Sequence, residues 1–158
     1  MPEMGTLKAK EVPFMTGIFI ALISGALMSL QGVFNTEVTK QSSMWVSASW
    51  VQFSALATCL VIWAAFDRSS FMALLKVNPK YMMLGGVFGA FITYTVIQSM
   101  SVLGPAKATM LIVIAQLTVS WVVELFGMFG LDKSAFSWRK CIGLFIAAAG
   151  VILFEWET

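Results

Sequence analysis

The chain has 158 residues, of which 59% are hydrophobic and only 11% are charged, and its mean hydropathy is +0.86. A soluble domain carries about 25% charged residues, so this composition excludes a water-soluble fold. The formal net charge of +2 is too small to indicate binding to nucleic acid.

Five apolar stretches without a charged residue divide the sequence: residues 12–34, 41–66, 81–106, 108–123 and 141–154. A helix of about 20 residues crosses a hydrocarbon core of roughly 30 Å. The stretches lack the alternation of barrel strands, and an open sheet edge would leave unpaired backbone groups in lipid. We therefore predict an all-α, polytopic membrane protein in which residues 1–158 form a single five-helix transmembrane domain. The predicted spans are residues 14–34, 44–66, 81–100, 106–128 and 138–156.

The ten Lys and Arg residues lie unevenly around these spans. The side of the bundle that contains the N-terminus would carry eight of them: Lys8, Lys10, Arg68, Lys76, Lys80, Lys133, Arg139 and Lys140. The opposite side would carry only Lys40 and Lys107. Because short cytoplasmic loops are enriched in basic residues, we predict that the N-terminus is cytoplasmic and the C-terminus lies outside.

The first span combines a small-residue face with two amides. Gly25 belongs to a series of small residues at four-residue steps, which is typical of a helix-packing face. Gln31 and Asn35 follow, one turn apart on one side of the helix. They either line a binding site or mark a helix end that becomes polar.

The second and third spans each bring polar groups into the bundle. Gln52 lies deep in the second span, and a buried amide in lipid needs a partner, so it should bond either another helix or a ligand. The third span opens with Gly85, Gly86 and Gly89, which permit close helix approach. Tyr94 and its neighbouring threonines follow and are candidates to line a cavity. The connection over residues 67–80 is expected to lie on the cytoplasmic headgroups.

The fourth span carries Gln116, Ser120 and Glu124 at four-residue steps, which places them on one face. An apolar tail over residues 125–131 predicts that the helix continues past Glu124 and that its carboxylate lies inside the membrane. There an ionised carboxylate costs about 2.5–3.5 kcal/mol, so it should be paired, solvated by a cavity or protonated. Alternatively, Glu124 simply reaches the cytoplasmic headgroups.

The fifth span has an uncharged core of only 14 residues, over 141–154, which corresponds to about 21 Å of helix. Packing on a neighbour would relieve this mismatch. Gly143 and Gly150 supply the small surface that such packing needs, within the chain or between subunits.

The residue inventory argues against an enzyme. The chain has no histidine and its carboxylates are scattered, so no nucleophile–base pair is visible. Cys59 and Cys141 share no metal-binding spacing and are expected to be reduced packing residues. We expect no metal and no cofactor.

The order of features resembles the YdcZ-type five-helix family of the drug/metabolite transporter superfamily. The resemblance is carried by the motifs Gly25…Ser29-Leu30-Gln31…Asn35, Gly85-Gly86-Val87-Phe88-Gly89, Ala115-Gln116, Glu124, Phe126-Gly127 and Arg139, which cover most of the chain. Two positions depart from the family pattern: Ala115 replaces a usual glycine and Glu124 replaces an expected aspartate.

The resemblance implies a half-unit of a secondary transporter, in which two five-helix units of opposite orientation pair in a bacterial inner (plasma) membrane. We expect export or import of a small polar or cationic metabolite or drug, coupled to an ion or a proton. The expected substrate-binding residues are Gln31, Asn35, Gln52, Tyr94, Gln116 and Ser120, and Glu124 would couple to the ion.

The expected partners are a small-molecule solute, membrane lipids and a second five-helix unit. The uneven charge favours an oppositely oriented, related chain, with an antiparallel homodimer as the alternative. Two other functions stay open: a non-transporting membrane subunit that docks a larger membrane partner through its glycine faces, and a small channel.

Overall fold

The computed structural model describes residues 14–155, which form five α-helices and contain no strand. The helices are α1 (Phe14–Gln41), α2 (Met44–Ile62), α3 (Gly85–Leu103), α4 (Pro105–Phe126) and α5 (Trp138–Glu155). The all-α prediction is confirmed. Lys8 and Lys10 of the predicted cytoplasmic N-terminus, and the predicted end of the fifth span at residue 156, lie outside the described residues.

Four helical stretches are long and apolar enough to cross a membrane: Phe14–Gln41, Met44–Asp67, Lys80–Leu103 and Pro105–Phe126. The remaining helix, α5, has 18 residues, and these include Arg139, Lys140 and Glu155. The fifth span therefore stays a prediction, as do the sides of the membrane on which the two termini lie.

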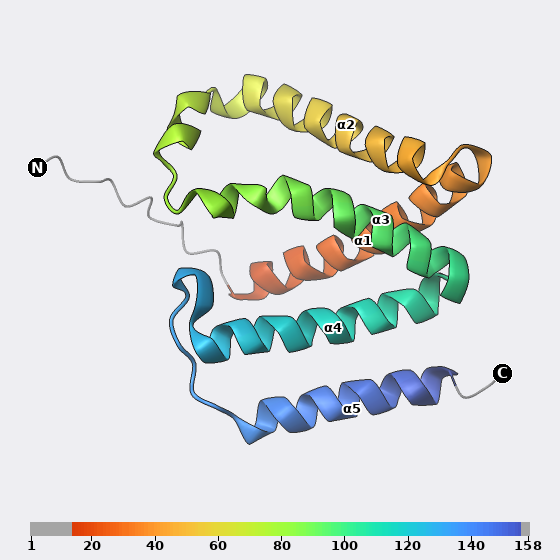
Figure 1. Cartoon of the computed structure of the whole chain (residues 1–158). Coiled ribbons are helices and arrows are strands. Elements are labelled where there is room, and N and C mark those ends of the chain that lie inside the picture. Colours follow the sequence, from red (N-terminus) through yellow and green to blue (C-terminus); the bar gives the residue numbers. More distant parts are fainter. Residues whose placement is uncertain (1–13, 156–158) are drawn as a thin grey trace, which may run out of the picture.

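Successive helices run in opposite directions, so their connections alternate between the two ends of the bundle (Figure 1). The central helix is α3, which contacts α1, α2 and α4. At the edge, α5 packs on α4 and on no other helix of the described part of the chain. The seam between α4 and α5 is therefore the only attachment of α5 within residues 14–155.

Helix ends follow from local sequence. Ser43 caps α2, because its hydroxyl oxygen accepts a hydrogen bond of 3.3 Å from the Val46 backbone N–H. Pro105 begins α4, where its fixed φ suits the first turn. Gly127 ends α4 in the left-handed region at φ 62°, which glycine adopts without steric cost. The helix continues past Glu124 only as far as Phe126, so the predicted end at residue 128 is two residues too late and the apolar tail does not extend the helix.

The connection between α2 and α3 is made of short helical turns. A π-helical turn at Trp63–Asp67 is followed by 3₁₀ turns at Phe71–Lys76 and Lys80–Leu84. Apolar side chains on it are exposed, including Phe71 and Leu75, and its contact with lipid headgroups stays a prediction.

Tight packing is confined to the end of the bundle where α1 turns into α2 and α3 turns into α4. The buried residues lie there: Gly32, Asn35, Thr36, Ser47, Ala48, Ile97, Met100 and Ala108. The closest approach is at Gly32, where an added Cβ would lie 2.5 Å from the Met100 methyl carbon. Sequence reasoning did not single out this glycine.

The glycines that were predicted to pack helices are open within this chain. An added Cβ at Gly25, Gly85, Gly86, Gly143 or Gly150 would meet no atom within 4 Å. At Gly89 the nearest atom is Gln52 Nε2, at 3.8 Å, which is an ordinary contact. Packing of these glycines against a second chain stays a prediction.

Candidate functional site

A cavity of about 110 Å³ lies between α1, α3 and α4, and three of the predicted site residues line it. These are Gln31 and Asn35 on α1 and Gln116 on α4. The hydroxyls of Ser29, Thr93 and Thr109 line it too, and the rest of its lining is glycine, methionine and branched aliphatic side chains. No charged side chain lines this space, which we call the amide cavity.

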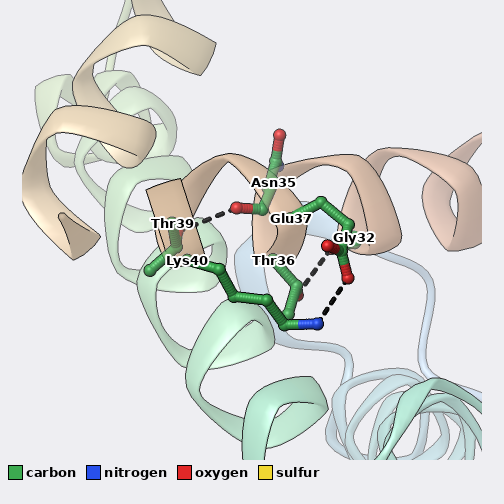
Figure 2. Close-up of polar contacts among 6 residues, drawn as sticks. All are labelled: Gly32, Asn35, Thr36, Glu37, Thr39 and Lys40. Atoms are coloured by element: carbon green, nitrogen blue, oxygen red, sulfur yellow. Dashed lines mark hydrogen bonds and ion pairs between the residues drawn. The ribbon is translucent and has the colours of Figure 1, made fainter. Parts of the chain in front are cut away.

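Asn35 is the most buried of the three amide residues, with only 8% of its surface exposed. Its backbone carbonyl accepts hydrogen bonds from the hydroxyls of Thr39, at 2.8 Å, and Ser47, at 3.0 Å. Its side-chain amide has no hydrogen-bond partner within residues 14–155. Figure 2 shows this side chain pointing away from the ion pair that Glu37 and Lys40 form on the same helix.

Gln31 and Gln116 reach the same cavity from different helices. Gln31 lies one turn before Asn35 on α1, and Gln116 lies in the middle of α4. Neither side chain makes a hydrogen bond to another described residue. The amide cavity thus gathers three amides whose donors and acceptors are all available.

Gln52 and Tyr94 lie outside the lining of the amide cavity. The Gln52 amide donates a hydrogen bond of 3.1 Å to the Thr93 hydroxyl, which in turn donates one of 2.9 Å to the Gly89 carbonyl. The sequence predicted that Gln52 bonds either another helix or a ligand, and the structure shows a bond to another helix, α3. The Tyr94 ring stacks on Trp45, with 5.0 Å between ring centroids.

Ser120 and Glu124 line a second cavity, of about 300 Å³, between α4 and α5. Glu124 Oε2 lies 2.8 Å from Lys140 Nζ, and each of the two side chains is about half exposed. Of the states that the sequence allowed for this carboxylate, pairing is the one observed. Glu124 also lies in the last turn of α4, as the headgroup alternative requires.

The polar face of α4 is therefore divided between two sites. Gln116 belongs to the amide cavity, whereas Ser120 and Glu124 belong to the second cavity, which we call the ion-pair cavity. The sequence analysis counted Lys140 among the basic residues of the cytoplasmic side and did not predict it as the partner of Glu124. The two residues are 16 positions apart on different helices, so no local spacing connects them.

Trp121 is a second lining residue of the ion-pair cavity that sequence reasoning missed. Its indole N–H is buried and has no hydrogen-bond partner in the described part of the chain. Its ring packs on Phe136, with 5.7 Å between centroids, in the connection that leads to α5. The only signal in the sequence was its position beside Ser120.

No group of three or more His, Cys, Asp or Glu side chains that could hold a metal ion occurs among residues 14–155. Cys59 and Cys141 are both free thiols. The two cavities are thus the candidate sites, and their chemistry is hydrogen bonding in one and charge pairing in the other.

Four apolar helical stretches of membrane length, with mainly apolar pockets between them that carry a few polar side chains, are the features of an integral membrane protein. The sequence profile of a family described as "Putative inner membrane exporter, YdcZ" matches residues 16–153. The chain therefore belongs to the YdcZ family, as its motifs indicated. Comparison with curated proteins and with solved structures gives no match.

Proposed function

We propose that this chain is one half of a secondary transporter that exports a small polar solute across a bacterial inner membrane, with the solute bound in the amide cavity. The observation that carries the proposal is the convergence of Gln31, Asn35 and Gln116 on one cavity while their side chains bond no described residue. Asn35 is buried, whereas Gln31 and Gln116 are exposed, and all three side-chain amides keep donors and acceptors with which a polar solute could form hydrogen bonds. The family description as an exporter supports the direction of transport.

The lining of the amide cavity indicates the chemistry of its solute. Each amide offers both donors and an acceptor, so the bound part of the solute should also carry both. The absence of charged groups from the lining favours an uncharged hydrogen-bonding group, because an ion would lose its hydration without a counter-charge.

We propose that Glu124 binds the coupling cation or proton at a separate position. It lies eight residues after Gln116 on α4, which corresponds to about 12 Å along the helix. Coupling between solute and ion would then pass through α4 instead of through direct contact. In proteoliposomes, Glu124→Gln should fold but lose pH-dependent transport. Unchanged pH dependence in this variant would remove Glu124 from the coupling mechanism.

The working unit is proposed to be a pair of five-helix chains with opposite orientation. The open surfaces at Gly85, Gly86 and Gly150, which line neither cavity, support a second chain, because small residues let transmembrane helices approach closely. The uneven placement of Lys and Arg supports a related, inverted partner. A docked non-transporting subunit is the alternative that the same open faces favour. Co-purification of a larger membrane protein with the chain, together with no solute transport by the isolated chain, would support this alternative.

The export test compares variants of the amide cavity with a matched amide elsewhere. The chain is expressed in a bacterial strain that lacks it, and mass spectrometry measures small polar metabolites in the medium and in the cells. Asn35→Ala and Gln116→Ala should abolish the export that the wild type adds, whereas Gln98→Ala should preserve it. Gln98 is an exposed amide on α3 that lines neither cavity. Full export by both cavity variants would contradict the proposal.

A further inference from the structure

The Glu124–Lys140 ion pair joins two helices, α4 and α5. The Glu37–Lys40 ion pair, in contrast, lies within one turn of α1. Lys140 belongs to the first turn of α5, and its ammonium lies 2.8 Å from Glu124 Oε2. The position beside this carboxylate oxygen therefore already holds a primary ammonium group.

The surroundings of that ammonium leave room for a ligand. The ion-pair cavity has a volume of about 300 Å³, and its remaining walls include Leu117, Trp121 and Leu144. Gly143 lines it as well, and an added Cβ there would meet no atom within 4 Å. Both charged side chains stay about half exposed, so the pair does not close the space around the carboxylate.

We propose that the ion-pair cavity is a binding site for small alkyl- or arylammonium cations, and that Lys140 occupies it as a built-in competitor. A ligand ammonium would displace Lys140 Nζ and donate its N–H groups to the Glu124 carboxylate, which accepts charge-assisted hydrogen bonds. Its apolar part would lie against Leu117 and Leu144, and the Trp121 ring offers a cation–π contact. The inference rests on the proposed coupling role of Glu124 and names the chemical class of cation.

Competition by Lys140 has a consequence for affinity. When the Lys140 ammonium is paired with Glu124, that carboxylate cannot bind a ligand ammonium. The apparent affinity for the ligand is therefore the intrinsic affinity multiplied by the fraction of protein in which Glu124 is unpaired. Displacement would also release the first turn of α5 from α4. Because α5 contacts no other described helix, displacement of Lys140 would weaken the packing between α4 and α5.

Equilibrium binding of radiolabelled n-butylammonium to the full chain in detergent tests the proposal. Lys140→Met keeps a side chain of similar length without the charge and should bind the probe about tenfold more tightly than the wild type. Arg139→Met removes the neighbouring charge, which does not line the cavity, and should leave binding unchanged. Tetramethylammonium, which has no N–H donor, and n-butanol, which has no charge, should not compete.

The double variant Glu124→Gln/Lys140→Met removes both charges together, so it leaves no unpaired ion that could prevent folding. It should elute as a folded protein and bind no probe. Equal affinity of wild type and Lys140→Met, or full binding by the double variant, would overturn the proposal. The two proposals can fail separately. Loss of export in Asn35→Ala together with no n-butylammonium binding would support the proposed function and contradict this site. Binding of n-butylammonium together with full export by Asn35→Ala would support this site and contradict the solute site in the amide cavity.

Discussion

The side-chain amide of Gln52 on α2 donates a 3.1 Å hydrogen bond to the hydroxyl of Thr93 on α3. Thr93 then donates to the Gly89 carbonyl on its own helix, and its side chain also lines the amide cavity. Gln52 thus holds a residue that lines the amide cavity, and its role as a substrate-binding residue stays a prediction.

A double-mutant cycle should detect this contact. Gln52→Ala and Thr93→Val together should show a coupling energy of about 0.6 kcal/mol, and at most about 1.7 kcal/mol, the range found for hydrogen bonds between membrane helices. Reversible unfolding in mixed detergent measures it. Thr95 is the control, because its hydroxyl donates to the Phe91 carbonyl of its own helix. A cycle of Gln52→Ala with Thr95→Val should show no coupling, and equal coupling in both cycles would contradict the assignment.

Gly32→Ala should destabilise the protein by about 1 kcal/mol through overpacking. The added Cβ would lie 2.5 Å from Met100 Cε and 2.6 Å from Met100 Sδ, and Met100 is itself buried. Gly17→Ala on the same helix meets no atom within 4 Å and should not destabilise it. Unfolding free energies of the two variants make the comparison. In combination with Met100→Ala, which removes both crowding atoms, the loss should be smaller than the sum of the two single losses.

Asn35→Leu should raise stability and abolish export at the same time. The variant replaces a buried amide that bonds no described residue with an apolar group of similar size, for an expected gain of about 1 kcal/mol. The backbone carbonyl of residue 35 would keep its bonds to Thr39 and Ser47. Thermal unfolding and the export assay are measured on the same preparation. A destabilised Asn35→Leu protein would mean that the amide has a structural partner.

Orientation can be measured with single cysteines in a Cys59→Ser/Cys141→Ser background. Ser42 and Ser69 are exposed and lie in connections at opposite ends of the bundle. With a membrane-impermeant maleimide, Ser42→Cys should react in intact cells and Ser69→Cys only after permeabilisation. Reaction of half of each population in intact cells would show both orientations and would favour the antiparallel homodimer.

The helices were predictable because the signal that specifies them is local. Charge-free stretches of membrane length identify α1 to α4, and Gly104 with Pro105 marks the turn between α3 and α4. The end of α4 was misplaced because the apolar residues after Phe126 suit a membrane helix as well as a turn. Only the left-handed conformation of Gly127 decides between them.

The site was predictable only as far as residue type allows. Polar side chains in an apolar helix favour the bundle interior, which identified Gln31, Asn35 and Gln116 as candidates before their cavity was known. Gln98 on α3 shows that the rule is not general, because it is exposed and lines neither cavity. Which groups meet across helices depends on rotation and tilt, which hydropathy does not encode. For that reason the sequence identified neither Thr93 as the partner of Gln52 nor Lys140 as the partner of Glu124.

The dependence of α5 on α4 alone bears on how the chain is assembled during synthesis. The contacts among α1, α2, α3 and α4 involve only chain that is made before α5, so they do not need α5 in order to form. A variant truncated after residue 137 should therefore keep a native-like four-helix core.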